Sequence, residues 1–143
     1  FSHGAGVKDN EVEQVEQLVN EQVQANVVVS PSEMDLQDAL KSGAMALFGE
    51  KYGDRVRVIR IGDFSTELCG GIHLDATGQI GLFQFAAQGG VAAGVRRIEA
   101  VTGPEAYTLV ESLQSRIAGA AAALKAQPDH LLRKLDQLIE ELK

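Results

Sequence analysis

The chain has 143 residues, 45% of them hydrophobic and 23% charged, a composition typical of one globular domain with a buried core. No apolar run approaches the roughly 18 residues of a membrane span. No basic stretch precedes an apolar one near the first residue, so we expect no signal peptide. The single cysteine cannot form an internal disulfide, which fits a cytoplasmic protein.

The charge is unevenly distributed along the chain. The net charge of −7 argues against a general nucleic-acid binder, because phosphate contacts depend on Lys and Arg. Residues 1–50 carry 2 basic and 9 acidic side chains, residues 51–100 carry 6 and 5, and residues 101–143 carry 5 and 6. We therefore expect any contact with RNA to use the middle segment.

The first third predicts two helices separated by a short strand. A helix capped by Asp9 or Asn10 is indicated by apolar residues at three- and four-residue spacing, which would pack on a sheet. These residues are Val12, Val15, Leu18, Val19 and Val23. Residues 27–29 then predict a strand that ends at Ser30-Pro31-Ser32, and residues 35–40 predict a second helix that Ser42-Gly43 stops.

Three further strands are predicted where branched and aromatic residues are bounded by glycines. They cover residues 55–61, residues 81–87, and a segment that begins at Val91 or Gly94 and ends at Val101. Short connections favour antiparallel pairing. We predict an α+β fold, with an antiparallel sheet, helices packed on one of its faces, and a long C-terminal helical segment.

From Pro104 onward the pattern is helical. Pro104 suits a first turn, and apolar residues recur through Leu124 until Pro128-Asp129 interrupts them, with Asp129 a candidate cap for the next helix. Leucines then follow at spacings of four, three and four, which is a coiled-coil seam: Leu131, Leu135, Leu138 and Leu142. Fewer than two heptads are too short to be stable alone, so we expect residues 131–142 to pack on a partner, on the preceding helix, or on a second copy.

The most informative motif is Cys69-Gly70-Gly71-Ile72-His73. A thiolate and an imidazole at this separation are good zinc ligands, and the two glycines let the backbone bring both to one ion. A structural zinc site needs four protein ligands and a catalytic one usually three, so Cys69 and His73 supply half of a site. The alternative is that Cys69 is simply a small buried hydrophobic residue.

The flanking sequence resembles the editing domain of alanyl-tRNA synthetase and its related free-standing deacylases. The similar segments are Gly62-Asp63-Phe64-Ser65-Thr66-Glu67-Leu68 before the motif, and residues 78–83 and 89–103 after it. Phe1-Ser2-His3 and residues 43–53 are also similar. The resemblance assigns residues 1–103 to the C-terminal half of the editing domain and residues 104–143 to the start of a helical linker. The first residue is phenylalanine, so we expect an excised fragment of a longer protein.

The resemblance implies that the matching cysteine and histidine bind zinc together with two histidines of an earlier His-x3-His motif. That motif is absent here. His3 lies in a segment that we interpret as structural, and His130 lies on the linker, where we expect it to be exposed. The implied reaction is hydrolysis of the ester that joins serine or glycine to tRNA(Ala). Zinc would activate water or polarise the ester carbonyl, or it would mainly hold the substrate.

Further residues are candidates for contacts with the substrate or the tRNA acceptor end: Gly70, Gly71, Ile72, Gly90, Arg96 and Arg97. Ile72 departs from the family pattern, which has threonine there, so it either removes a substrate contact or packs in the core. Arg96 and Arg97 are adjacent in a predicted strand and point to opposite faces. One would meet tRNA while the other pairs with a carboxylate such as Glu99, or both are solvated.

The remaining candidates are weaker. Asp63, Glu67 and Asp75 could orient His73, although isolated carboxylates near turns are more often caps. Gly89-Gly90 and Gly94 either approach a ribose or phosphate or form ordinary turns.

Three hypotheses for the whole chain stay open. The chain is an editing-hydrolase fragment that is inactive without its missing N-terminal half, a non-catalytic module that self-associates, or a free-standing enzyme completed by an oligomer.

Overall fold

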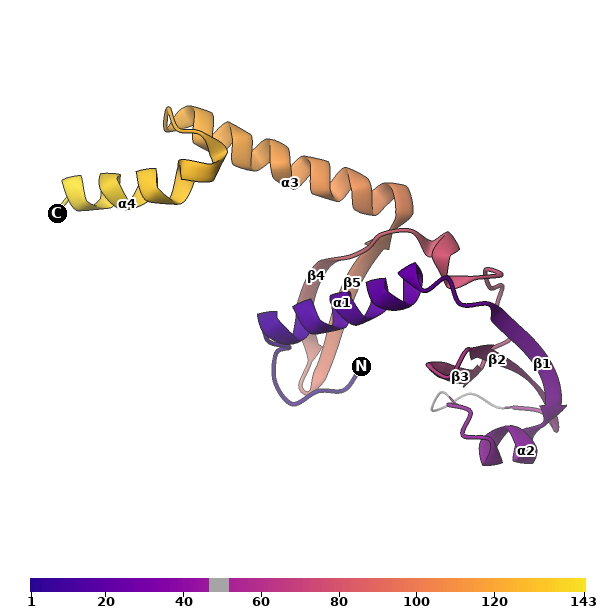
Figure 1. Cartoon of the computed structure of the whole chain (residues 1–143). Coiled ribbons are helices and arrows are strands. Elements are labelled where there is room, and N and C mark those ends of the chain that lie inside the picture. Colours follow the sequence, from indigo (N-terminus) through magenta and orange to yellow (C-terminus); the bar gives the residue numbers. More distant parts are fainter. Residues whose placement is uncertain (47–51) are drawn as a thin grey trace.

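The computed structural model describes residues 1–46 and 52–143 and shows an elongated α+β molecule. Figure 1 shows one small sheet with α2, a separate hairpin beneath α1, and an arm of two helices that extends away from both. The predicted α+β class, the antiparallel pairing and the C-terminal helices are confirmed. The strands form two sheets among the described residues rather than one. Part of the similar segment 43–53 lies outside the described residues.

The first sheet has three antiparallel strands in the order β1-β2-β3. Its elements are β1 (Val29–Asp35), β2 (Arg55–Ile61), β3 (Ser65–Leu68) and the short helix α2 (Leu36–Lys41). Alternate residues of β2 point to opposite faces, and Val56 and Val58 pack with Leu68 against α2. Ala39, at the centre of α2, is completely buried in this cluster. The loop that carries the Cys69 motif begins where this core ends.

The second sheet is a hairpin of β4 (Phe83–Ala92) and β5 (Val95–Thr102), covered by α1 (Asp9–Gln24). Side chains of α1 bind the backbone of β4 directly. The Asn20 amide donates to the Phe83 carbonyl at 2.9 Å and accepts from its N–H at 3.0 Å. The Glu16 carboxylate accepts from the Phe85 N–H at 2.8 Å. These bonds satisfy strand groups that an unpaired edge would expose.

A buried threonine, Thr77, connects the first sheet to α1. The short 3-10 helix η1 (Thr77–Ile80) follows the motif loop and lies against the end of α1. The Thr77 hydroxyl donates to the Gln22 carbonyl at 2.6 Å and accepts from the Val27 N–H at 2.8 Å. The end of α1, the approach to β1 and the segment after His73 are therefore fixed to one another.

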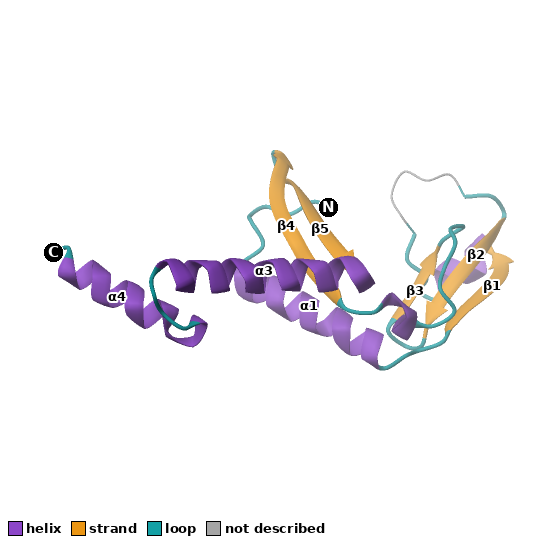
Figure 2. Ribbon diagram, turned by 90° about the horizontal axis from the view of Figure 1, so that it is seen from above, coloured by secondary structure: helices purple, strands orange, loops and turns teal. Residues whose placement is uncertain are grey.

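The C-terminal arm consists of α3 (Gly103–Ala123), the 3-10 turn η2 (Pro128–His130) and α4 (Leu131–Glu141). Pro104 lies in the first turn of α3, as predicted. Figure 2 shows α3 and α4 running away from the hairpin toward the C-terminus. In the part of the chain that the structure describes, no helix combines the length and apolar character needed to cross a bilayer.

Several predicted boundaries are wrong. Lys8, rather than Asp9 or Asn10, is the N-cap of α1, and its N–H donates to the Glu11 carboxylate. The strand predicted at residues 27–29 does not stop at Ser30-Pro31-Ser32 but continues to Asp35, because pairing with β2 holds it. Pro31 is tolerated since β1 is an edge strand.

Other differences concern the second half. Asp129 does not cap α4, whose N-cap is His130. Gly89-Gly90 form no turn: they lie inside β4, opposite Arg97 and Arg96. The hairpin turns at Ala93-Gly94, where Gly94 has a φ of 69°. The predicted strand at residues 55–61 is confirmed without change.

Candidate metal centre and nucleic-acid contacts

The motif loop is anchored at its start by the first sheet. Cys69 follows the last residue of β3, and its N–H donates to the Arg57 carbonyl at 3.1 Å, which extends the strand pairing by one residue. The Arg57 guanidinium reaches over the loop and donates to the Gly71 carbonyl at 2.5 Å. One residue of the central strand therefore binds the loop at two points and fixes its path after the cysteine.

Cys69 and His73 converge on the space beside Gly71. A Cβ placed on Gly71 would lie 3.5 Å from the Cys69 Sγ and 4.0 Å from the His73 Nε2. The His73 Nε2 is buried and has no hydrogen-bond partner among the described residues. A buried polar atom without a partner is costly, and a metal ion would satisfy it. These two side chains therefore fit two ligands of one zinc ion.

The other candidate ligands lie elsewhere. Among the residues that the structure describes, no three His, Cys, Asp or Glu side chains are grouped closely enough to hold a metal ion. His3 lies beside the hairpin, where its Nδ1 is 2.7 Å from the Ala5 carbonyl oxygen, and His130 is exposed at the α3–α4 junction. No hydrogen bond joins Asp63, Glu67 or Asp75 to His73 in the described part, so nothing there supports the orienting role.

Ile72 does not pack in the core. Its side chain is fully exposed, at the surface of a shallow cavity of about 240 Å³ that His73 also lines. The rest of the lining is mostly apolar and includes Val29 and Ile61. The second of the two alternatives for Ile72 is thus wrong, and its side chain is accessible beside the histidine.

Arg96 points toward the N-terminal segment that precedes α1. Its guanidinium lies close to two glycines: a Cβ on Gly90 would be 3.2 Å from Nη1, and one on Gly6 would be 3.3 Å from Nη2. The Arg96 Nε is buried without a partner in the described residues. The small glycines make room for this side chain, which packs under the N-terminal segment rather than on an open surface.

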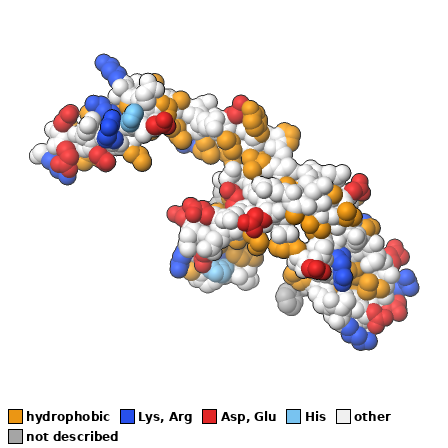
Figure 3. Space-filling model, viewed as in Figure 1, with side chains coloured by type: hydrophobic (Ala, Val, Ile, Leu, Met, Phe, Trp, Pro, Cys, Tyr) orange, Lys and Arg blue, Asp and Glu red, His pale blue; other side chains and the backbone are white. Residues whose placement is uncertain are grey.

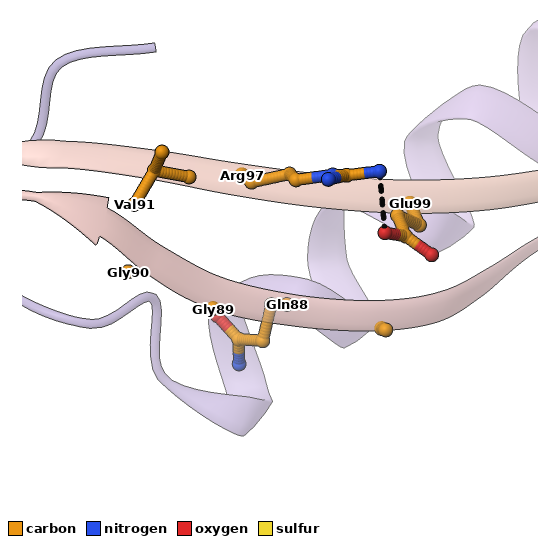
Figure 4. A pocket seen from close by; sticks show the side chains of 7 residues that line it. Gln88, Gly89, Gly90, Val91, Arg97 and Glu99 are labelled. Carbon is orange, nitrogen blue, oxygen red and sulfur yellow. Dashed lines mark ion pairs between the residues drawn. The ribbon is translucent and has the colours of Figure 1, made fainter.

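Arg97 occupies the opposite face of the hairpin and pairs with Glu99, as one alternative predicted. The Arg97 Nη2 is 2.9 Å from the Glu99 Oε1. Figure 4 shows the pair along β5, with Gly89 and Gly90 on the facing strand. Together they border an open hollow of about 370 Å³. Because Ala87, Gly89 and Gly90 line this hollow and have small side chains or none, solvent reaches the ion pair.

The structure does not bring all the predicted site residues together. Cys69, Gly70, Gly71, Ile72 and His73 lie beside the first sheet, whereas Gly90, Arg96 and Arg97 belong to the hairpin (Figure 1). The cavity beside His73 and the hollow beside Arg97 share no lining residue.

Comparison with known proteins tests the resemblance found in the sequence. Residues 56–99 match the family described as the threonyl and alanyl tRNA synthetase second additional domain. All 143 residues align at 54% identity with the alanine–tRNA ligases of Burkholderia mallei (strain NCTC 10229) and Burkholderia pseudomallei (strain 668). The predicted resemblance is confirmed. The chain is similar to alanine–tRNA ligase along its whole length and spans 16% of the length of these relatives.

The matched segment contains Cys69, His73 and the tRNA candidates predicted from the sequence, together with one residue that the prediction missed. Arg57 lies within residues 56–99 and holds the motif loop through the Gly71 carbonyl. Its position in β2 gave no chemical signal, because alternating basic residues on a strand also suit a solvated face. The contact between Arg57 and the Gly71 carbonyl depends on the three-dimensional path of the loop, which the sequence pattern does not indicate.

Proposed function

We propose that this chain is part of the editing domain of an alanine–tRNA ligase and supplies Cys69 and His73 to a zinc site. The reaction would be hydrolysis of the ester that links serine or glycine to tRNA(Ala), in the cytoplasm. The observation that carries the proposal is the convergence of the Cys69 Sγ and the His73 Nε2 on the space beside Gly71, with Nε2 buried and unpartnered. The similarity to alanine–tRNA ligases supports the reaction class.

The chain's own residues would position the reacting groups. β3 and the Arg57 contacts fix the loop, so that the Cys69 thiolate and the His73 imidazole face one point. Zinc held there would activate water or polarise the ester carbonyl, or retain the substrate. Hydrolysis adds water to the carbonyl carbon, breaks the bond to the ribose oxygen of tRNA, and returns a proton to that oxygen. Ile72 is exposed and lines the same cavity as His73, so its side chain would be accessible to a substrate bound there.

Two ligands are too few for a stable zinc site. We propose that two further ligands come from the missing N-terminal half of the domain, and that the chain alone has little or no deacylase activity. The acceptor end of tRNA(Ala) would then enter between the two halves. The free-standing enzyme is disfavoured because it needs a complete ligand set from copies of this chain.

The experiment that tests the proposal is zinc bound per chain, measured by equilibrium dialysis against buffered free zinc so that a two-ligand site is not stripped, for the natural protein and Cys69→Ala. Binding of zinc that disappears in Cys69→Ala supports the half-site. Cys69→Ser is the more conservative control, since its hydroxyl is a poor zinc ligand. A folded protein whose zinc content is the same with and without the thiol would overturn the assignment.

A second candidate function has an observation of its own. The apolar face of α4 is open to solvent in this chain, with Leu132 at 76% and Leu142 at 87% exposure. A wide exposed apolar stripe on a helix is typical of a surface that packs on another helix. This favours a self-association module, either beside the zinc half-site or in place of it.

A further inference from the structure

A basic hollow lies where α3 turns into α4. It has a volume of about 230 Å³, and its lining includes three cations, one histidine and two amides. These residues are Lys125, Arg133, Lys134, His130, Gln127 and Gln137. Figure 3 shows Lys and Arg side chains gathered beside a histidine at this end of the molecule. We call these residues the junction notch.

Among residues 1–46 and 52–143, the cations of the junction notch have no anionic partner. Within the described residues, the ion pairs involve only Lys41, Arg55, Arg97 and Lys143 as cations. Asp129 and Asp136 are near in sequence, but neither lines the notch. Three like charges around one hollow repel one another unless an anion enters.

The helix poles make this arrangement more unfavourable. Arg133 and Lys134 occupy the first turn of α4, which contains no acidic residue, although the positive pole of a helix favours acids there. Lys125 is the exception, because it follows the C-terminal end of α3, where the helix dipole favours a positive charge. The first turn of α4 thus adds its own positive potential to the two cations that it carries.

We propose that the junction notch binds backbone phosphates of the tRNA, an inference that rests on the proposed function. The cations would neutralise one or two phosphates, and the two glutamine amides would donate to phosphate or ribose oxygens. The site lies in the last third of the chain, outside the middle segment expected from the charge count. The sum over residues 101–143 conceals it, because four of the six acids in that range lie away from the notch: Glu105 and Glu111 on α3, and Glu140 and Glu141 at the end of α4.

The test is binding of a tRNA(Ala) transcript as a function of salt concentration. The variant Lys125→Gln/Arg133→Gln/Lys134→Gln removes three charges from exposed or half-exposed positions. A matched control, Lys8→Gln/Lys41→Gln/Arg55→Gln, removes three charges elsewhere. We expect the notch variant to bind about tenfold more weakly at low salt and to reduce the slope of log K against log salt by about two units. Arg133→Lys should retain binding, because it keeps the charge.

The remaining outcomes overturn the proposal. Equal losses in the notch variant and the control would mean that only total charge matters. No binding by the natural chain at low salt would remove the site altogether. Unchanged tRNA affinity with altered sedimentation of the notch variant would assign the charges to contacts between chains. Zinc content of the same variants keeps this result separate from the metal proposal, since the notch variant should bind as much zinc as the natural chain.

Discussion

At the residue scale, Gly71 is the position that most directly tests the geometry of the proposed zinc site. Gly71→Ala would place a methyl 3.5 Å from the Cys69 Sγ and 4.0 Å from the His73 Nε2, at ordinary contact distances. The fold should survive, but the methyl fills the space that an ion needs within about 2.0–2.3 Å of both atoms. We expect zinc affinity to fall by about tenfold or more, measured by competition with a coloured chelator.

Gly70 provides the matched control for this prediction. A Cβ at Gly70 meets no atom within 4 Å, so Gly70→Ala makes the same chemical change one residue away in open space. It should leave zinc affinity unchanged. If both alanine variants bound zinc as tightly as the natural chain, the ion would not lie between the cysteine and the histidine.

Sequence spacing was sufficient to predict that Cys69 and His73 lie close together, because only three residues, two of them glycines, separate them, and both side chains lie beside Gly71. Their zinc-binding role stays a prediction. Spacing was insufficient for Arg57 and Ile72. The Arg57 contact with the Gly71 carbonyl depends on how the loop folds back over β2, and the exposure of Ile72 depends on where that loop then leaves the sheet. Neither is a property of local sequence. Arg96 and Arg97 were correctly placed on opposite faces, since strand periodicity alone decides that.

At the scale of elements, the attachment of α1 to β4 depends on Asn20. Its amide makes two hydrogen bonds with the Phe83 backbone and is partly buried. Asn20→Ala would leave the Phe83 N–H and carbonyl without these partners, so we expect the free energy of unfolding in urea to fall by about 1–3 kcal/mol. Gln17→Ala, which removes an exposed amide bonded to Glu21 on the same helix, should cost less than about 0.5 kcal/mol. Equal costs would contradict the role given to Asn20.

The elements differ in how well local sequence predicts them. Residues 55–61 form a strand as predicted, because Arg and Val alternate over residues 55–58 and the branched residues Ile59 and Ile61 continue the strand. β1 runs through Pro31, against local propensity, because pairing with β2 outweighs it and an edge strand tolerates the missing N–H. The local sequence Gly89-Gly90 is typical of a turn, yet pairing with Arg97 and Arg96 keeps both glycines in β4.

The apolar face of α4 carries a prediction about association. Leu135 is 38% exposed and lies at the centre of the seam that begins at Leu131 and ends at Leu142. If two chains pack through this face, the sedimentation coefficient should rise with concentration, and Leu135→Glu should abolish the rise, because a buried unpaired carboxylate is costly. Gln137→Glu adds the same charge at a position outside the seam and should have no effect. A natural chain that sediments as a monomer at all concentrations would exclude this association.

At the scale of the whole molecule, the small size of the buried core is the main feature. The largest buried cluster lies around α2 and the first sheet, whereas α3 buries only Ala106 and Ala121 over 21 residues. Large hydrophobic side chains are exposed from Phe1 to Leu142. A chain that spans 16% of its relatives' length and exposes this much apolar surface is consistent with docking against further parts of a longer protein.

The corresponding prediction is complementation. Adding the proposed N-terminal half of the editing domain, as a separate polypeptide, should raise zinc affinity, because two further ligands would complete the coordination of an ion that Cys69 and His73 would hold only in part. Release of serine from seryl-tRNA(Ala) should appear only in the mixture and should be lost with Cys69→Ala in this chain. Leu135→Glu in the mixture should leave the hydrolysis rate unchanged, since α4 contributes no ligand. Hydrolysis by this chain alone at the rate of the mixture would show that the half-site is already complete, and the missing ligands would then have to come from copies of this chain.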